Sequence, residues 1–267
     1  MKYIVNAFNF SIRNWMLIIP LYALTALAAL IDGAGGTLGL SAITSILTGG
    51  SLNDPGQLIN LIPGILVTAA GGGIVSFLVQ FAINPISYGL VNKSLETGSA
   101  SLNDISAVLK ENFVKYLLYF VGQLVVFGVF FIAAFLVVLL LGLIASVLGP
   151  IGIALIFIVV IALLLAYLII TTLLCLWFSA MVIDNHDVVA AAKKSVEIVK
   201  SYFWTVLGIN VLVLIAGSII GSILSFINVI PLLGPIIYSV VPAAQTFILF
   251  VFYISFYREK TGRAAIA

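Results

Sequence analysis

The hydrophobic and polar positions of the chain fall into long apolar runs that are separated by short polar segments. The longest run, from Tyr116 to Ile183, contains no Asp, Glu, Lys or Arg, and each half exceeds the roughly 20 residues that a helix needs to cross a hydrocarbon core. The segment Gly149–Gly152 supplies a turn near its middle. Because the runs are apolar on all sides, they predict lipid-buried helices, whereas a membrane β-barrel would show strict alternation of apolar and polar positions.

The runs predict an all-α fold, a polytopic transmembrane bundle with six spans arranged as three helical hairpins. Six spans return the chain to the side of the membrane on which it starts. The predicted spans are Trp15–Ile31, Ile62–Leu90, Tyr116–Leu148, Ile151–Ile183, Phe203–Phe226 and Ile236–Tyr257.

The N-terminal segment has a second interpretation. Lys2 and Arg13, followed by an apolar stretch that ends near Ala26-Leu27-Ala28, resemble a secretory signal with its cleavage site. A retained first helix is favoured because the stretch is long enough to span, and because the remaining spans pair evenly only if it stays.

Composition supports a membrane environment and excludes one class of partner. The 267 residues are 63% hydrophobic and only 7% charged, against roughly 25% charged residues in a typical soluble domain. The net charge of +2 and the lack of a basic run interleaved with aromatic residues argue against nucleic acid as a partner. Cys175 is the only cysteine, so neither an intrachain disulfide nor a cysteine-based metal site is available.

The distribution of cations predicts the orientation. With six spans, all eleven Lys and Arg residues fall on one side of the membrane, and the opposite loops hold Asp32 and Asp54. Since Lys and Arg in short loops resist translocation, this side is expected to be the cytoplasmic side of the cell membrane, with both termini in the cytoplasm. The outer loop Asp32–Pro63 has an apolar patch that rests on the interface or, alternatively, re-enters the membrane.

An internal pattern recurs three times along the single integral membrane domain, 1–267. Lys110-x-x-Phe113 and Lys200-x-x-Phe203 are the best-matched anchors, and Arg13-x-Trp15 is a looser third. Each precedes an outward span, a turn and a returning span. The predicted pseudo-repeats are roughly 1–92, 93–183 and 184–257, followed by a short cytoplasmic tail, 258–267.

Two amphipathic elbows are predicted on the cytoplasmic side. One follows a capping signal that starts at Ser101 and has Asp104 at the third position, and the other opens at Asp187. Their lysines are expected to face anionic headgroups, and each elbow either positions the next span or forms a site for a partner or regulatory lipid. These interface lysines are Lys110, Lys115, Lys193, Lys194 and Lys200.

The second elbow carries a resemblance to a known family. Its matching positions are Phe178, Met181-Val182-Ile183, Asp184, Ala191, Lys194, Ser195, Val199, Lys200, Phe203, Trp204 and Leu207. In these positions the chain resembles a prokaryotic group of six-helix membrane proteins that includes the membrane domain fused to some glycerophosphodiester phosphodiesterases and many uncharacterised stand-alone members. The resemblance implies architecture; the soluble phosphodiesterase domain is not in this chain, and its hydrolytic activity is not carried over.

Five amide side chains lie inside the predicted spans: Gln80, Asn84, Gln123, Asn210 and Gln245. Four of them, all but Asn84, are roughly eight to twelve residues from the cytoplasmic ends, which places them near the midplane at about 1.5 Å per residue. An amide in hydrocarbon needs a partner, so the layer either joins helices by hydrogen bonds or lines a substrate or lipid path. The spacing Gly217-x-x-x-Gly221-x-x-x-Ser225 predicts a close helix contact, either within the chain or between two copies.

Groups for catalysis or metal binding are sparse. The segment Asp184-Asn185-His186-Asp187 has the composition of a divalent metal site, but residues of this kind more often accept hydrogen bonds from the first amides of a helix. We therefore expect no metal, no cofactor and no enzymatic activity. A lipid-headgroup enzyme would need this segment to converge with Asp104 or Glu111.

The sequence favours a non-enzymatic scaffold or accessory subunit of a transport or envelope system. The alternative is a small-molecule or lipid transporter that uses the midplane amides. A hydrated cavity lined by at least three of these amides would distinguish the transporter from the scaffold. The expected partners are membrane lipids and either a second copy of the chain or another membrane protein.

Overall fold

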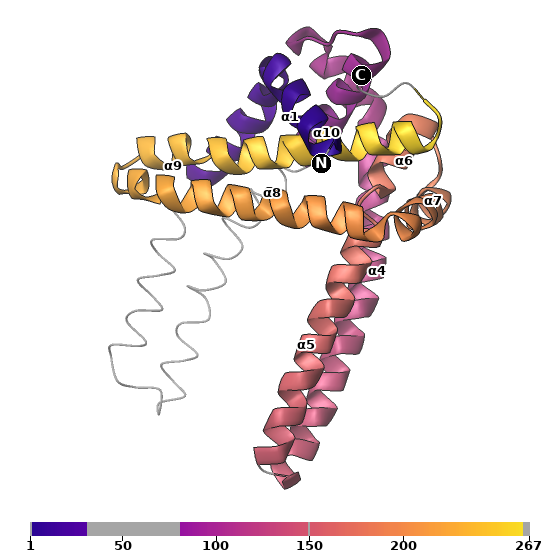
Figure 1. Cartoon of the computed structure of the whole chain (residues 1–267), viewed down its shortest axis with the longest axis vertical. Coiled ribbons are helices and arrows are strands. Elements are labelled where there is room, and N and C mark those ends of the chain that lie inside the picture. Colours follow the sequence, from indigo (N-terminus) through magenta and orange to yellow (C-terminus); the bar gives the residue numbers. More distant parts are fainter. Residues whose placement is uncertain (1, 31–80, 149, 264–267) are drawn as a thin grey trace.

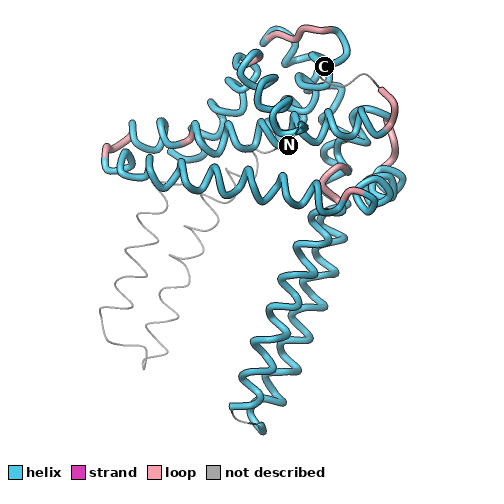
Figure 2. The backbone as a smooth tube through the Cα atoms, viewed as in Figure 1, coloured by secondary structure: helices cyan, strands magenta, loops and turns pink. Residues whose placement is uncertain are grey.

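A computed structural model of the chain describes residues 2–30, 81–148 and 150–263, and all regular structure within these residues is helical (Figure 2). The all-α prediction is therefore confirmed for this part of the chain. The elements are α1 (Lys2–Arg13), η1 (Trp15–Ile18), a helix over 19–30, a helix over 81–97, η2 (Leu102–Asp104), α4 (Ile105–Leu148), α5 (Pro150–Leu173), α6 (Trp177–Asp184), α7 (Val188–Ser201), α8 (Phe203–Leu224), η3 (Ser225–Val229), α9 (Leu233–Tyr238) and α10 (Val240–Lys260).

Four helical segments of the described residues are long and apolar enough to cross a membrane: Leu102–Gly142, Ala154–Asp184, Phe203–Ile227 and Leu233–Lys260. They correspond to the last four predicted spans. The pair Lys2–Arg13 and Trp15–Leu30, which is bent by 90°, gives a fifth if it is counted as one broken span. Most of the predicted span Ile62–Leu90, together with the Asp32–Pro63 loop, lies outside the described residues, so six spans and three hairpins stay predictions.

The helices α4 and α5 form a long hairpin that leaves the rest of the structure (Figure 1). The helices α8 and α10 lie side by side and run crosswise to this hairpin, so the described helices do not form a single parallel bundle (Figure 1). The first predicted elbow, which follows the Ser101 cap, is not separate from its span. It continues without a break into α4, which has 44 residues and is about 66 Å long at 1.5 Å per residue.

Local signals in the sequence set several helix ends. The backbone N–H of Ser101 donates to Asp104 at 2.8 Å, as the capping signal predicts. The side chain of Asp187 accepts from the N–H of Ala190 at 2.8 Å and caps α7. Helix α5 begins at Pro150, the first-turn position that tolerates a missing N–H.

A buried hydroxyl explains one break that the sequence does not predict. The predicted span Ile151–Ile183 is interrupted between α5 and α6. The Ser195 hydroxyl of α7 donates to the carbonyl of Leu173 at 2.7 Å and accepts from the N–H of Leu176 at 3.2 Å. One side chain thus satisfies a backbone acceptor and a backbone donor at the break.

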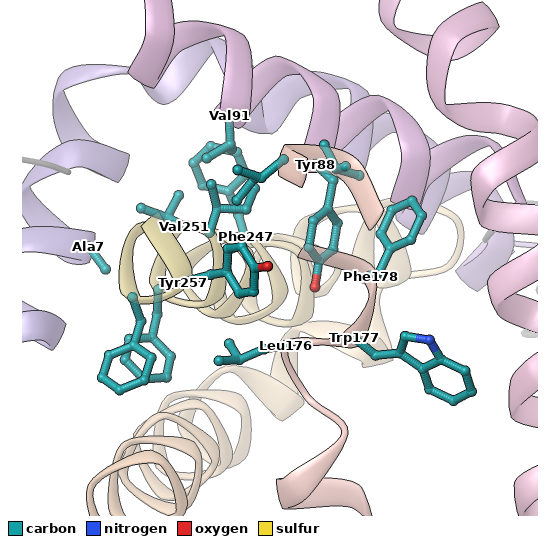
Figure 3. Close-up of a cluster of buried hydrophobic side chains, with 14 of the residues drawn as sticks. Ala7, Tyr88, Val91, Leu176, Trp177, Phe178, Phe247, Val251 and Tyr257 are labelled. Atoms are coloured by element: carbon teal, nitrogen blue, oxygen red, sulfur yellow. The ribbon is translucent and has the colours of Figure 1, made fainter. Parts of the chain in front are cut away.

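The core lies where α6 meets the helix over 81–97, α7 and α10 (Figure 3). Phe178 makes an edge contact with Tyr88, whose ring centroid is 4.8 Å away. The indole N–H of Trp177 donates to the carbonyl of Val188 at 2.7 Å. Because α6 is buried over nearly its whole length, it joins the hairpin to the crossing pair α8 and α10.

Replacing Ser195 with Ala tests the origin of the break between α5 and α6. The variant leaves a buried N–H and a buried carbonyl without this partner, and we expect a loss of about 1–3 kcal/mol in the free energy of unfolding. Ser201→Ala, at the exposed end of the same helix, is the matched control. Equal thermal stability of the two purified variants in detergent would contradict the assigned role.

Candidate functional site

The described amides within the predicted spans do not bond to one another. The Nδ2 group of Asn84 donates to the Tyr116 hydroxyl at 2.5 Å, and the Nε2 group of Gln123 donates to the Tyr119 hydroxyl at 2.8 Å. Gln80 lies outside the described residues. A layer of amide-to-amide bonds is therefore not present among the described amides.

The two amides of the crossing pair bridge α8 and α10. The Tyr253 hydroxyl donates to the Oδ1 atom of Asn210 at 2.9 Å, and the Nε2 group of Gln245 donates to the carbonyl of Val213 at 3.3 Å. Both bonds connect residues that are far apart in sequence. They consequently hold the two helices together, as the packing interpretation of the amides expects.

These two amides also line a groove of 310 Å³ between α5, α8 and α10. Two threonines of α5, Thr171 and Thr172, and Tyr253 of α10 add hydroxyl groups to its wall. Asn84 and Gln123 are not among its lining residues. The groove is thus lined by two of the predicted amides. A transport path was expected to be lined by at least three of them.

A second groove lies on the other side of the α8 and α10 contact and has a volume of 480 Å³. Its wall is formed by α1, α8 and α10, and Gln245 is the one lining residue with an amide side chain. Since Gln245 lines both grooves, its side chain lies on the boundary between them. Apolar grooves of this volume fall within the range of small-molecule sites.

The small residues of α8 pack inside the chain. A Cβ atom at Gly217 would collide with the amide group of Gln245, and a Cβ atom at Gly221 would lie 3.1 Å from the Tyr238 hydroxyl. The absence of side chains at these glycines lets Gln245 and Tyr238 approach the backbone of α8. Of the two contacts predicted for this face, the structure shows the intrachain one.

The segment Asp184–Asp187 forms a junction with the C-terminal part of the chain. Asp184 accepts from the Tyr257 hydroxyl at 2.6 Å, pairs with Arg263, and lies 3.8 Å from the imidazole of His186. Asp187 caps α7. Within residues 2–30, 81–148 and 150–263 no group of three or more His, Cys, Asp or Glu side chains is arranged to hold a metal ion.

Two further cations fasten the end of α10. Arg258, which is buried, lies 3.1 Å from Glu96 and donates to Asn92 at 2.8 Å. Lys260 donates to the Tyr3 hydroxyl at 3.0 Å and lies over the ring of Tyr202, 4.3 Å from its centroid. Such a cation over aromatic rings is attracted to their faces. These contacts tie α10 to α1, to the helix over 81–97 and to the junction of α7 and α8.

The five predicted interface lysines occupy two helices that touch each other, α4 and α7. Lys115 pairs with Glu111 at 3.6 Å, and Lys194 pairs with Glu197 at 3.2 Å. Lys110, Lys193 and Lys200 make no ion pair within the described part of the chain.

Sequence reasoning missed the tyrosines that form hydrogen bonds with the amide side chains. Tyr116, Tyr119 and Tyr253 each bond an amide side chain through the phenolic hydroxyl. A signal was present, because a hydroxyl within an apolar run needs a partner just as an amide does. Tyr119 precedes Gln123 by four residues, which places both on one face of a helix.

A double-mutant cycle measures the bond between α8 and α10. Asn210→Leu and Tyr253→Phe should couple by about 0.6 kcal/mol in the free energy of unfolding, the typical value for a hydrogen bond between membrane helices. Combining Asn210→Leu with Tyr116→Phe, whose hydroxyl serves Asn84, is the control and should be additive. Additivity in the first cycle would show that the bond does not hold the helices together.

Comparison with known proteins yields a family and no characterised relative. A family model described as a domain of unknown function, DUF7847, matches residues 24–257. No curated protein and no solved structure matches the chain. Since the match covers most of the sequence, the chain belongs to the DUF7847 family.

Proposed function

We propose that the chain is a non-enzymatic multi-pass membrane protein that acts as a scaffold or accessory subunit of a transport or envelope system. In this proposal it has six spans in three hairpins, and the resemblance to the six-helix prokaryotic group extends to that architecture. All six spans cross the membrane together only if α8 and α10 turn from their crosswise placement to lie along the α4 and α5 hairpin (Figure 1). Its functional surface is the apolar hairpin of α4 and α5, which docks a partner inside the membrane.

The observation that supports docking is the length of the apolar part of α4. Residues 116–148 contain no charge and form about 50 Å of helix, whereas a hydrocarbon core is about 30 Å thick. A tilt of 40°, the upper end of the usual range, still projects about 38 Å onto the membrane normal. A bilayer of ordinary thickness leaves part of this surface uncovered, and an apolar partner surface covers it.

The described polar side chains support a structural role, because their hydrogen bonds and ion pairs join helices of the chain. Asp184, Arg258 and Lys260 are engaged with other side chains of the chain, and each described amide within the predicted spans has a hydrogen-bond partner. Groups engaged in this way stabilise helix contacts, which is the role that a scaffold requires of them.

We place both termini in the cytoplasm and the chain in the cell membrane. Two contacts support a common side for the termini: Tyr3 of α1 bonds Glu259 and Lys260 at the end of α10. The bias of Lys and Arg toward one side then supports the cytoplasm as that side.

The second candidate is a small-molecule or lipid transporter, favoured by one observation. Gln245 stands between the two grooves that flank the α8 and α10 contact, so a movement of this side chain would join them. In this alternative the amide acts as a partition in a path for an amphipathic molecule.

Photocrosslinking from the end of the hairpin separates the two functions. A photoreactive residue in place of Phe157, which is 67% exposed on α5, should yield a discrete adduct with a second polypeptide in native membranes. The same replacement at Ile219, exposed on α8, is the control and should not yield that adduct. Adducts with lipid alone at Phe157, together with lipid flux in proteoliposomes that Gln245→Leu abolishes, would contradict the scaffold and support the transporter.

A further inference from the structure

The exposed side of α7 carries two lysines that the fold does not use. The buried side of this helix is formed by Ala191, Ser195, Ile198 and Val199. Lys193 and Lys200, seven residues apart and therefore close to one helical face, are both exposed. Within the described residues neither ammonium group makes an ion pair.

The charges around this face leave it positive. Glu197, the one acidic residue of α7, lies on the same face, four residues after Lys193 and three before Lys200, and its carboxylate is 3.2 Å from Lys194. With Lys193, Lys194 and Lys200 counted against this one carboxylate, the face keeps a net charge of +2. Asp187 is engaged in capping the start of the helix. The two lysines are separated by about 10 Å along the axis, and the one carboxylate of their helix is paired with Lys194.

An exposed tryptophan marks where this face meets the apolar surface. Trp204 is 80% exposed and lies in the first turn of α8, directly after the lysine-bearing helix. From there α8 presents exposed apolar side chains, including Leu212 and Leu214. Tryptophan is enriched at the boundary between hydrocarbon and headgroups, so Trp204 marks this end of α7 as a place where such a boundary would lie.

We propose that the face of α7 defined by Lys193 and Lys200, together with Trp204, is a binding surface for the headgroups of anionic phospholipids. In this surface each lysine pairs with the phosphodiester of a separate lipid. The Trp204 indole lies at the acyl boundary of the same lipids. The surface gives the chain a preference for anionic over zwitterionic lipid and does not depend on whether the hairpin docks a partner.

Native mass spectrometry of the full-length chain in detergent, titrated with phosphatidylglycerol, tests this surface. Each cation near an anionic surface contributes about 1 kcal/mol, so Lys193→Gln/Lys200→Gln should weaken the binding of each of the first two lipids about fivefold, and the product of their two binding constants about thirtyfold. Phosphatidylcholine should bind wild type and variant alike. Lys193→Arg/Lys200→Arg keeps the charge and should retain the preference for phosphatidylglycerol.

Lys2→Gln/Arg13→Gln removes the same net charge from two exposed positions of α1 and is the matched control. It should leave the binding of phosphatidylglycerol within about twofold of wild type if α7 carries the site. Equal weakening in both double variants would mean that net charge alone attracts the lipid and would overturn the proposal. Unchanged binding in Lys193→Gln/Lys200→Gln would overturn it as well, and the melting temperature of each variant shows that its fold is intact.

Discussion

The apolar surface of the α4 and α5 hairpin is the constraint on which the rest of the structure depends. Side chains such as Val129, Phe131 and Ile132 are each more than half exposed, and their spacing places them on different sides of α4. Water does not support so large an unpaired apolar surface, so the hairpin requires an apolar surrounding. Since helices satisfy their own backbone hydrogen bonds, they are suited to such a surrounding.

Contacts at the base of the hairpin give the chain a fixed shape. Helix α6 is buried between α4, α7 and α10, and Ser195 stabilises the break that lets the chain turn into it. Arg258 and Lys260 then connect the end of α10 to segments more than 150 residues away in sequence. Most polar side chains described above serve these connections, and the exposed lysines of α4 and α7, Lys110, Lys193 and Lys200, are exceptions.

Much of the local structure could be predicted from the sequence, because short-range physics decides it. The caps at Ser101 and Asp187 and the helix start at Pro150 follow from residue type and spacing. The break between α5 and α6 could not be predicted, since no Gly or Pro marks it and its hydrogen bonds come from Ser195 on another helix.

The candidate site was likewise predictable in part. The positions of Asn210 and Gln245 inside apolar runs predicted that they need partners, but periodicity does not tell which helix supplies them. The structure assigns Tyr253 and the backbone at Val213. The crosswise placement of α4 and α5 against α8 and α10 likewise arises from tertiary packing and left no mark on the apolar pattern (Figure 1).

The most direct test of the central claim is to label cysteines at the two ends of the hairpin in intact cells. On a Cys175→Ala background, a membrane-impermeant maleimide should label Ile151→Cys at the start of α5 from outside. It should label Glu111→Cys near the start of α4 only after the membrane is permeabilised. Labelling of both positions in intact cells would contradict a hairpin that crosses the membrane, and the reverse pattern would contradict its orientation.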